Sequence, residues 1–438
     1  MKRIFLFFPV FILLGTVHAQ IGDSVNGKSL EDCIKYALDH QTNIRQSLID
    51  EQITEREIKI RLSDWYPQLN FSGNYQNNFQ RPVSIFTNGA QSIGTYNASG
   101  GYFILNQTIF NRDVLLASQS KKDVRLSSRQ NTVNTRIAVV SNVSKAFYDL
   151  LLSTQQISLL DTDIVLLERS LKDAYNQYKG GLVDKTDYQR ATITLNNTKA
   201  SRITASETLK IRASVLKLYM SYPVDSVLLV TYDSAKMIQE VTSFDTLQQV
   251  DLNKRIEYQQ LLTEKRLEQE NLKYYKWGFL PTLSAYGQYN LNYYNNQFKD
   301  LFQTNYPNSY AGLTLTLPLF TGTRHIQEVK VAKLQLERLD YNFISLKDSI
   351  NTQFVEALSS YKSNLSNYYA QKENLDLAHQ VYNIIQLQYR AGIKTYLDVV
   401  IANIDLFSAQ VNYVNAMYQV LSNRIDVERA LGTLKYNY

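Results

Sequence analysis

The sequence predicts a mixed fold in which very long α-helices are joined to short β-strands that span a membrane, with the same order of elements built twice. Three observations predict it. The chain begins with a secretory signal pattern, two segments of about 70 residues keep a seven-residue apolar repeat, and four segments alternate apolar with polar residues. This combination points to an elongated, membrane-embedded protein made of two similar repeats.

Residues 1–19 read as a secretory signal peptide. Lys2 and Arg3 precede an apolar run from Ile4 to Leu14, and small residues follow as far as Ala19. The run is shorter than the roughly 20 apolar residues that a membrane-spanning helix needs. The alternative is a buried N-terminal segment. We expect no other apolar run of spanning length, which argues against a helical membrane protein.

Composition and charge argue against several classes of protein. The formal net charge is +6, but basic and acidic residues are intermixed without a basic block, which argues against nucleic acid as a partner. The single cysteine, Cys33, excludes an intrachain disulfide. The 32 tyrosines are over-represented, and many lie close to Asn, Gln and Ser. The 7 prolines and 16 glycines in 438 residues suit long uninterrupted helices.

The chain contains two copies of one plan. Pro67–Tyr75 and Pro281–Tyr289 share the pattern P-x-L-x-x-x-G-x-Y. The order of features in both halves is helix, strand, strand, very long helix, glycine break, helix. The sequence therefore predicts a first repeat at residues 20–230 and a second at residues 231–438.

The strongest signal is a seven-residue apolar repeat in two segments, at about 112–178 and 323–389. Adding 211 to each position in the first segment gives the matching position in the second. A sustained 3.5-residue period is typical of coiled coils, and each helix would be roughly 100 Å long. The positions in the first segment are Val139, Val143, Ala146, Leu150, Ser153, Ile157, Leu160, Ile164, Leu167, Leu171, Ala174 and Tyr178. The helix after Thr395 is expected to continue such a series at Val400, Ile404, Phe407, Val411, Val414, Tyr418, Leu421 and Ile425.

Four segments alternate apolar and polar residues with period two, at about 68–80, 95–110, 281–294 and 309–320. Each would be a strand with one apolar and one polar face. Aromatic residues gather near the ends of the later two segments, as the interfacial girdle of an outer-membrane barrel requires. The alternative is a soluble antiparallel sheet packed on one face. The signal peptide, the apolar faces and the aromatic residues together favour the membrane barrel.

Four strands cannot close a barrel by themselves. The smallest membrane barrels have eight strands, and an open sheet edge in lipid leaves backbone groups unpaired at a cost of several kcal/mol each. Two copies of the chain would supply eight strands, and three copies twelve. Eight strands leave an interior filled by side chains, whereas twelve leave room for a conduit. The sequence therefore demands an oligomer, and a transport role favours the larger one.

Over essentially its whole mature length, the chain resembles the TolC-like outer-membrane efflux family. The resemblance is carried by the two P-x-L-x-x-x-G-x-Y strand entries, the paired long helices, YRAGIKTYLDV at 389–399 and RALGTL at 429–434. It implies a homotrimer whose twelve-stranded β-barrel, with four strands from each chain, is joined to a long α-helical coiled-coil barrel in the periplasm. The segment from Tyr222 to Phe244 would belong to a belt around the middle of that barrel.

The resemblance also implies a function. The chain would be the outer-membrane exit duct of a tripartite efflux or type I secretion system, a passive channel gated at its periplasmic helical tips. Its partners would be two further copies in a homotrimer, a periplasmic adaptor (membrane fusion) protein, an inner-membrane RND or ABC transporter and outer-membrane lipid. No cofactor and no metal are expected. Drug, metal and protein export share such a duct, and the sequence does not choose among these cargoes.

Two glycine breaks, at Gly181 and Gly392, are expected to be the turns of helical hairpins. Glycine readily adopts the left-handed conformation in which many helices end. Asp184 and Thr395 follow at the right distance to cap the returning helices. The two breaks are therefore interpreted as the tips of the long hairpins.

Asp187 and Asp398 would each be the third residue of a returning helix, where a carboxylate suits the helix dipole in any hairpin. The resemblance implies a further role. In the family, an aspartate of the first tip links to a tyrosine and a basic residue of the second, and Asp187, Tyr389 and Lys394 match those positions. Asp398 matches the first of two aspartate rings, but Ile401 occupies the second. The expected periplasmic gate is Asp187, Tyr389, Lys394 and Asp398, with one acidic ring that would still favour cations.

Two other functions were weighed against the duct. An enzyme is disfavoured because the three histidines after the signal peptide lie far apart, in no metal-binding spacing, and no phosphate- or dinucleotide-binding motif occurs. The second alternative is a periplasmic coiled-coil adaptor or structural protein without a membrane pore. Such a protein would have one helical hairpin and soluble β-domains, and it would need no detergent.

Overall fold

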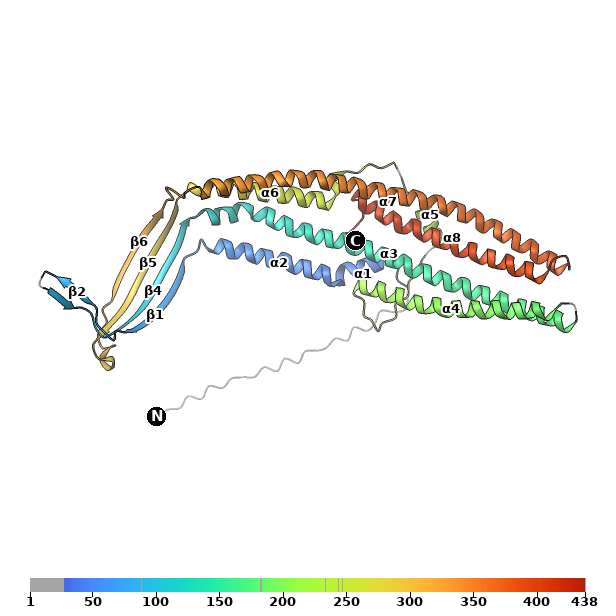
Figure 1. Ribbon diagram of the computed structural model, residues 1–438, viewed down its shortest axis with the longest axis horizontal. Coiled ribbons are helices and arrows are strands. Elements are labelled where there is room, and N and C mark those ends of the chain that lie inside the picture. Colours follow the sequence, from blue (N-terminus) through green and yellow to red (C-terminus); the bar gives the residue numbers. More distant parts are fainter. Residues whose placement is uncertain are drawn as a thin grey trace, which may run out of the picture.

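The computed structural model describes residues 27–437, apart from residues 88, 182, 233, 243 and 246. The described chain is strongly elongated, with a β-sheet at one end and the tips of two helical hairpins at the other (Figure 1). The predicted signal peptide, residues 1–19, lies outside the described residues.

Both halves of the chain follow the order that the sequence predicts. The first half contains α1 (Leu30–His40), α2 (Thr42–Ser63), β1 (Gln68–Asn77), β2 (Val83–Phe86), β3 (Gly89–Ser92), β4 (Asn97–Phe110), α3 (Arg112–Lys179) and α4 (Lys185–Met220). The second contains α5 (Ser234–Thr242), α6 (Ile256–Lys276), β5 (Thr282–Asn295), β6 (Asn308–Thr316), α7 (Arg324–Arg390) and α8 (Tyr396–Leu431). Three short 3-10 turns, η1 (Leu252–Lys254), η2 (Trp277–Phe279) and η3 (Phe298–Asp300), complete the described elements.

The main sheet has the strand order β1-β4-β5-β6, and each neighbouring pair is antiparallel. The register aligns Phe71 with Phe103, Phe103 with Tyr289, and Tyr289 with Ser309. Up to a bulge in β4 between Thr108 and Phe110, odd-numbered residues therefore share one face, which is largely apolar and aromatic, and even-numbered residues share the other, which is rich in Asn, Gln, Ser and Thr. β6 ends at Thr316, earlier than expected, because Pro318 has no N–H for a ladder bond.

A small hairpin of β2 and β3 stands between β1 and β4, and the sequence analysis missed it. The two strands pair with each other and form a sheet separate from the main one (Figure 1). The signal was present, since Asn88-Gly89 between apolar residues is a strong hairpin sequence. Gly89 has a φ of 103°, a backbone conformation that residues other than glycine rarely adopt.

The two long helices form the frame of the molecule. α3 has 68 residues and α7 has 67, so each is roughly 100 Å long at 1.5 Å per residue. α2 and α6 lie beside the halves of α3 and α7 nearer the sheet, and α4 and α8 lie beside the distal halves (Figure 1). Every predicted apolar position on α3 is buried or half-buried except Tyr178, which confirms the heptad reading.

The predicted series on α8 is wrong at one position in its distal half, Ile404, while Val400, Phe407 and Val411 are half-buried. Ile404 is 51 % exposed, whereas Ala402 and Leu406 are buried. The buried stripe is displaced because α8 packs against α3 as well as α7, so that its buried face lies between the two contact lines. Nearer the middle of the molecule the predicted positions Tyr418 and Leu421 are buried as expected.

The sequence analysis expected no further apolar run long enough to span a membrane, and α3 contains one. By length and composition alone it is the one described helix that could cross a membrane, with a window of mean hydropathy 1.3. A helix buried in the core of a soluble protein can have the same length and hydropathy. Val140, Val143 and Phe147 of α3 belong to the main buried cluster.

The largest apolar core lies where α1, α3, α4, α7 and α8 meet in the middle of the molecule. Cys33, Val143, Phe147 and Leu216 have no exposed surface there (0 %). Burial raises the pKa of the Cys33 thiol to about 12, so this cysteine behaves as a core residue and not as a reactive thiol. The core therefore binds the two halves into one body at mid-length.

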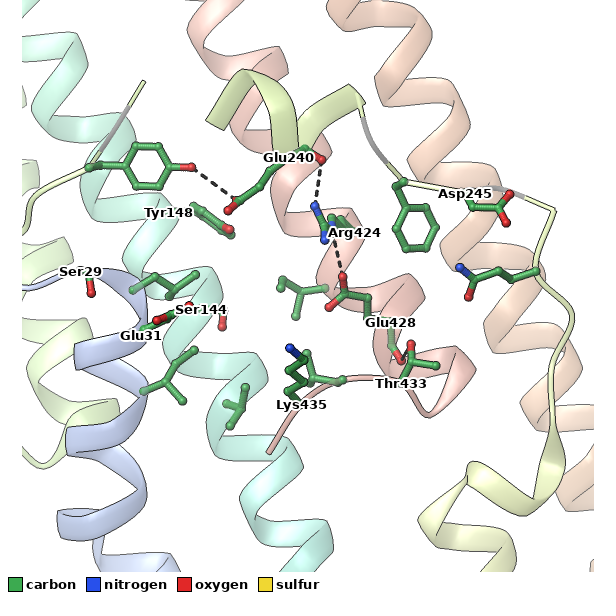
Figure 2. Close-up of a pocket in the computed structure, with 18 of the residues that line it drawn as sticks. Ser29, Glu31, Ser144, Tyr148, Glu240, Asp245, Arg424, Glu428, Thr433 and Lys435 are labelled. Carbon is green, nitrogen blue, oxygen red and sulfur yellow. Dashed lines mark hydrogen bonds and ion pairs between the residues drawn. The ribbon is translucent and has the colours of Figure 1, made fainter. Parts of the chain in front are cut away.

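The segment between the repeats is fastened to α8 beside this core. Arg424 donates to the backbone carbonyl of Glu240 (2.9 Å) and to the carboxylate of Glu428 (2.8 Å). Tyr232 donates to the Glu240 carboxylate at 3.4 Å. Figure 2 shows these residues lining an open pocket between α1, α3, α8 and the inter-repeat segment. The inter-repeat segment is thus held by polar contacts over an apolar core.

Phe147→Ala should lower the stability of the chain by about 3–5 kcal/mol, because it deletes a fully buried ring from the main core. The measurement is the thermal midpoint of the purified protein. Phe147→Leu retains most of the buried volume and should lose less than half as much. An unchanged midpoint for the alanine variant would show that this core does not hold the halves together.

Candidate functional site

The first hairpin tip joins α3 to α4. α3 ends at Lys179, and Gly181 follows with a φ of 70° and donates its N–H to the carbonyl of Tyr178 (3.0 Å). The Asp184 side chain accepts from the N–H of Thr186 at 2.9 Å and so caps α4. Glycine is needed here because the left-handed turn strains any residue with a Cβ.

The second tip joins α7 to α8 with the same plan. Gly392 has a φ of 73°, and its N–H donates to the carbonyl of Tyr389 (3.0 Å), while the N–H of Ile393 donates to Gln388 (2.9 Å). This pair of bonds is a Schellman motif, which satisfies carbonyls that the helix end leaves unpaired. Both predicted hairpin glycines thus lie in left-handed turns.

Asp398 forms a capping box at the start of α8. Its carboxylate accepts from the Thr395 N–H (2.9 Å) and hydroxyl (2.8 Å), and that hydroxyl accepts from the Asp398 N–H (3.4 Å). Lys394 lies 3.7 Å from the same carboxylate. The backbone and hydroxyl hydrogen bonds of Thr395, and then the charge of Lys394, hold the pKa of Asp398 below its ordinary value. Asp398 is thereby kept ionised at the tip.

Tyr389 and Asp187 are close but are not hydrogen-bonded to each other within the described chain. The Tyr389 hydroxyl donates to the side-chain oxygen of Gln177 at 2.7 Å. Burial raises the pKa of Tyr389, with smaller contributions from nearby groups that include Asp187. The structure thus brings Lys394 to Asp398 and Tyr389 to Gln177. No hydrogen bond or ion pair of the Asp187 side chain occurs among the described residues of this one copy.

A small apolar cluster holds the two tips side by side. Ala174, Ala191 and Tyr396 are buried in it, and Tyr389 packs against it. The rings of Tyr389 and Tyr396 meet edge to face at 6.0 Å. This cluster is separate from the main core, so the hairpin ends have their own local packing.

Sequence reasoning missed the polar residues that link the hairpins above the tips. Ser170 donates to the Tyr396 hydroxyl at 3.1 Å, and Asn403 donates to the Asp163 carboxylate at 2.9 Å. Burial raises the pKa of Asp163 above its ordinary value. The available signal was a second heptad stripe on α3, polar instead of apolar, that runs beside the apolar series.

The site offers helix-capping carboxylates, tyrosine hydroxyls and the ammonium of Lys394, arranged around hairpin ends. Among the described residues, no group of three His, Cys, Asp or Glu side chains could hold a metal ion. Ile401, which stands where the family resemblance implies a second aspartate ring, is 50 % exposed on α8. The arrangement holds the hairpin ends together and presents the ionised carboxylate of Asp398 at the second tip.

Comparison with known proteins gives the family of the chain. The model of the family described as outer membrane efflux protein matches residues 33–220 and 257–433. The outer membrane protein TolC of Escherichia coli strain K12 is 23 % identical over 97 % of this chain and 86 % of that protein.

Solved structures share the fold. A crystal structure of CusC aligns with a TM-score of 0.74 at 16 % identity, covering 92 % of this chain and 91 % of that one. The Campylobacter jejuni CmeC outer membrane channel gives a TM-score of 0.71 at 17 % identity, covering 93 % and 87 %. The sequence-derived family and fold class are confirmed. With two family matches that together cover most of its length, the chain belongs to the outer membrane efflux protein family.

Proposed function

We propose that three copies of this chain form the exit duct of a tripartite efflux or type I secretion system in the outer membrane. The observation that carries the proposal is a four-stranded sheet with two unpaired edge strands, β1 and β6, at the end of helical hairpins roughly 100 Å long. Such a sheet is stable in lipid when its edges pair with those of other copies. Three copies supply twelve strands and an interior wide enough for cargo.

The directions of the strands allow this closure. The four strands alternate in direction, so the first and last run oppositely, and β6 of one copy would lie antiparallel to β1 of the next. The contact is head-to-tail, and it closes when rotation brings the last copy back to the first.

The two faces of the sheet suit a lipid-embedded conduit. The odd-numbered face presents Phe71, Phe103, Tyr289, Leu313 and Leu315, of which the last two are 68 % and 66 % exposed in one copy. Exposed apolar side chains of this extent require cover, which lipid provides. None of the four strands contains Asp, Glu, Lys or Arg. The polar face would line the interior with amides and hydroxyls.

The long helical hairpins support a duct that extends from the outer membrane across the periplasm to partner proteins. The tips lie at the end opposite the sheet (Figure 1), where an adaptor protein and an inner-membrane RND or ABC transporter would be reached. Two curated relatives of this chain, both from Pseudomonas putida, are described as outer membrane proteins of efflux pumps. Passage through the duct involves no chemical step, which accords with the non-enzymatic function proposed.

The division into repeats at 20–230 and 231–438 is part of the proposal. It is supported by the equivalent order of elements and by helices of 68 and 67 residues in corresponding positions. Asp187, Tyr389, Lys394 and Asp398 are proposed as the gate, with Gly181 and Gly392 as its turns. The hydrogen bond from Tyr389 to Gln177 supports this role, because it joins the two hairpin ends and can be exchanged for hydrogen bonds with water.

The native mass of the protein in detergent tests the proposal directly. Twelve strands require a particle three times the mass of one chain, and the protein should need detergent because its barrel face is apolar. A monomer, or a particle that stays dispersed without detergent, would favour the coiled-coil adaptor and exclude the shared barrel.

Asp398→Asn should lower the preference of the channel for cations by about twofold or more, because it removes the acidic ring while an amide can still accept the capping bonds. The measurement is the reversal potential in a salt gradient. Since the pKa of Asp398 is lowered, the preference of the wild type should persist as the pH falls to about 4. Glu373→Gln on α7 is the matched charge control. Equal selectivity for both variants would remove Asp398 from the gate.

Asp187→Ala combined with Tyr389→Phe should raise single-channel conductance by about twofold or more and increase drug leakage, because the hydrogen bond from Tyr389 to Gln177 is lost and the proposed link through Asp187 is removed. Asp184→Asn is the control, since it removes a charge from the same tip but preserves the cap of α4. If the double variant and the control conduct alike, Asp187 and Tyr389 do not hold the duct shut.

A further inference from the structure

The even-numbered face of the main sheet carries several tyrosines, among them Tyr102, Tyr286 and Tyr310. Under the proposed function this face is the inner wall of the conduit, so its side chains decide what passes the membrane end. The four strands contain no charged side chain. The wall can therefore distinguish cargo by size and by hydrogen bonding, and it has no fixed charge with which to select ions.

Two of these tyrosine rings lie over glycines. A Cβ on Gly100 would overlap the hydroxyl end of the Tyr102 ring, two residues along the same strand. A Cβ on Gly312 would lie 2.7 Å from the Tyr286 hydroxyl oxygen and 2.8 Å from the ring carbon that bears it. Gly312 is also the cross-strand partner of Tyr286. Each ring thus occupies a recess that exists because the residue beneath it is glycine.

The rings lie along the sheet instead of standing out from it. Side chains in strands usually stand roughly perpendicular to the sheet, but a ring whose tip fills the Cβ position of a neighbour must lie flat. Beside Tyr286, the ring of Tyr310 meets it edge to face at 6.3 Å. The Tyr310 hydroxyl in turn donates to the side-chain oxygen of Gln288 at 2.5 Å. The aromatic rings are thus spread over the wall.

Two glycines of the other face provide a contrast. A Cβ on Gly73 would meet other atoms at 3.8 Å or more, and one on Gly287 at 3.9 Å or more, which is ordinary contact. Alanine therefore fits at these two positions, whereas at Gly100 or Gly312 it would displace a tyrosine. A displaced ring has the sheet behind it and neighbours such as Asn74 beside it, so it would turn toward the middle of the conduit.

We propose that the sheet end of the duct sorts cargo by size and not by charge, and that Tyr102 and Tyr286, each held in a recess over a glycine, set its bore. The inference rests on the proposed function, because a bore exists only when several copies close the barrel. It assigns a role in specificity to residues at the membrane end, far from the tips.

Gly100→Ala combined with Gly312→Ala should narrow the bore by forcing both rings off the wall. The measurement uses a thiol at Thr316→Cys, which lies on the same face at the helix end of β6, deeper than both rings. The native Cys33 is buried and does not compete. Maleimide polymers of graded size are added to intact cells. The labelling rate for polymers near the size limit of the unaltered wall should fall by about fivefold or more, while a small maleimide reacts as before.

Gly73→Ala combined with Gly287→Ala is the matched control, since it adds two methyl groups to the same sheet at positions with room for them. It should leave every labelling rate unchanged. Adding Tyr102→Ser and Tyr286→Ser to the alanine variant should restore labelling by the larger polymers, because the displaced rings are removed. An alanine variant that labels as fast as its parent, an equal loss in the control, or no recovery with serine would overturn the inference.

The two serine substitutions in the glycine background keep the test decisive if the alanine variant fails to assemble. Rings that already lie flat on the wall obstruct little, so Tyr102→Ser with Tyr286→Ser should change the rates by less than about twofold. A large rise in the size limit would show that the rings stand in the bore, which contradicts the recess.

Two maleimide polymers of one size, ended by an ammonium or by a carboxylate, test the absence of charge selection. Their rates at Thr316→Cys, each divided by the rate at the exposed position Ser92→Cys, should agree within about twofold. Asp398 does not interfere, because it lies roughly 100 Å away at the tips, whereas charges in physiological salt are screened over about 8 Å. A larger preference for either charge would overturn this half of the proposal.

The labelling experiment separates this inference from the proposed function. If no maleimide reaches Thr316→Cys in the assembled protein, the even-numbered face lines no conduit and the duct itself is wrong. If labelling depends on polymer size but the alanine variant labels as its parent does, the duct stands and the recessed rings alone fail.

Discussion

The structure depends above all on one constraint: a β-sheet edge in lipid has no water to satisfy its backbone groups. The main sheet has two such edges, β1 and β6, and its apolar face has no cover within the chain. Association of several copies answers both needs. In the proposed trimer the long hairpins would consequently be held in a ring, with their tips brought toward one axis. The sheet end would thus determine the geometry of the tip end.

Between the two ends, the helices combine two kinds of packing. The main core at mid-length is apolar and includes Phe147, Leu216 and Leu421, so it keeps the repeats together as one body. Toward the tips the core narrows to a small cluster around Tyr396, and polar contacts take over. Separating two packed helices exposes apolar surface at a cost proportional to its area. Polar groups that lose their hydrogen bonds to each other form new ones with water instead. The distal half is therefore the end better suited to movement.

The tip residues show how one side chain can serve structure and transport together. Asp398 begins α8 through its capping box, and the same bonds keep its pKa low. A charge placed there for helix capping is thereby available at the mouth of the proposed duct. Ile401, one turn further along, contributes no second charge. The structural requirement at Thr395 and Asp398 is local to each chain, whereas any role in selectivity arises from three copies around an axis.

The sequence alone determined the elements, their order and the family. Heptad and period-2 patterns indicate which side chains are packed within one helix or strand, and glycines indicate turns of the backbone. Both are local properties, so they can be predicted from the sequence alone. The missed β2–β3 hairpin was readable in the same way, from Asn88-Gly89. The tertiary structure decided what depends on two distant segments meeting: the offset of the buried stripe on α8, the pairing of Tyr389 with Gln177 instead of Asp187, and the hydrogen bond between Asn403 and Asp163. Those contacts follow from the rotation of each helix about its axis, which three-dimensional packing sets and a linear repeat does not specify.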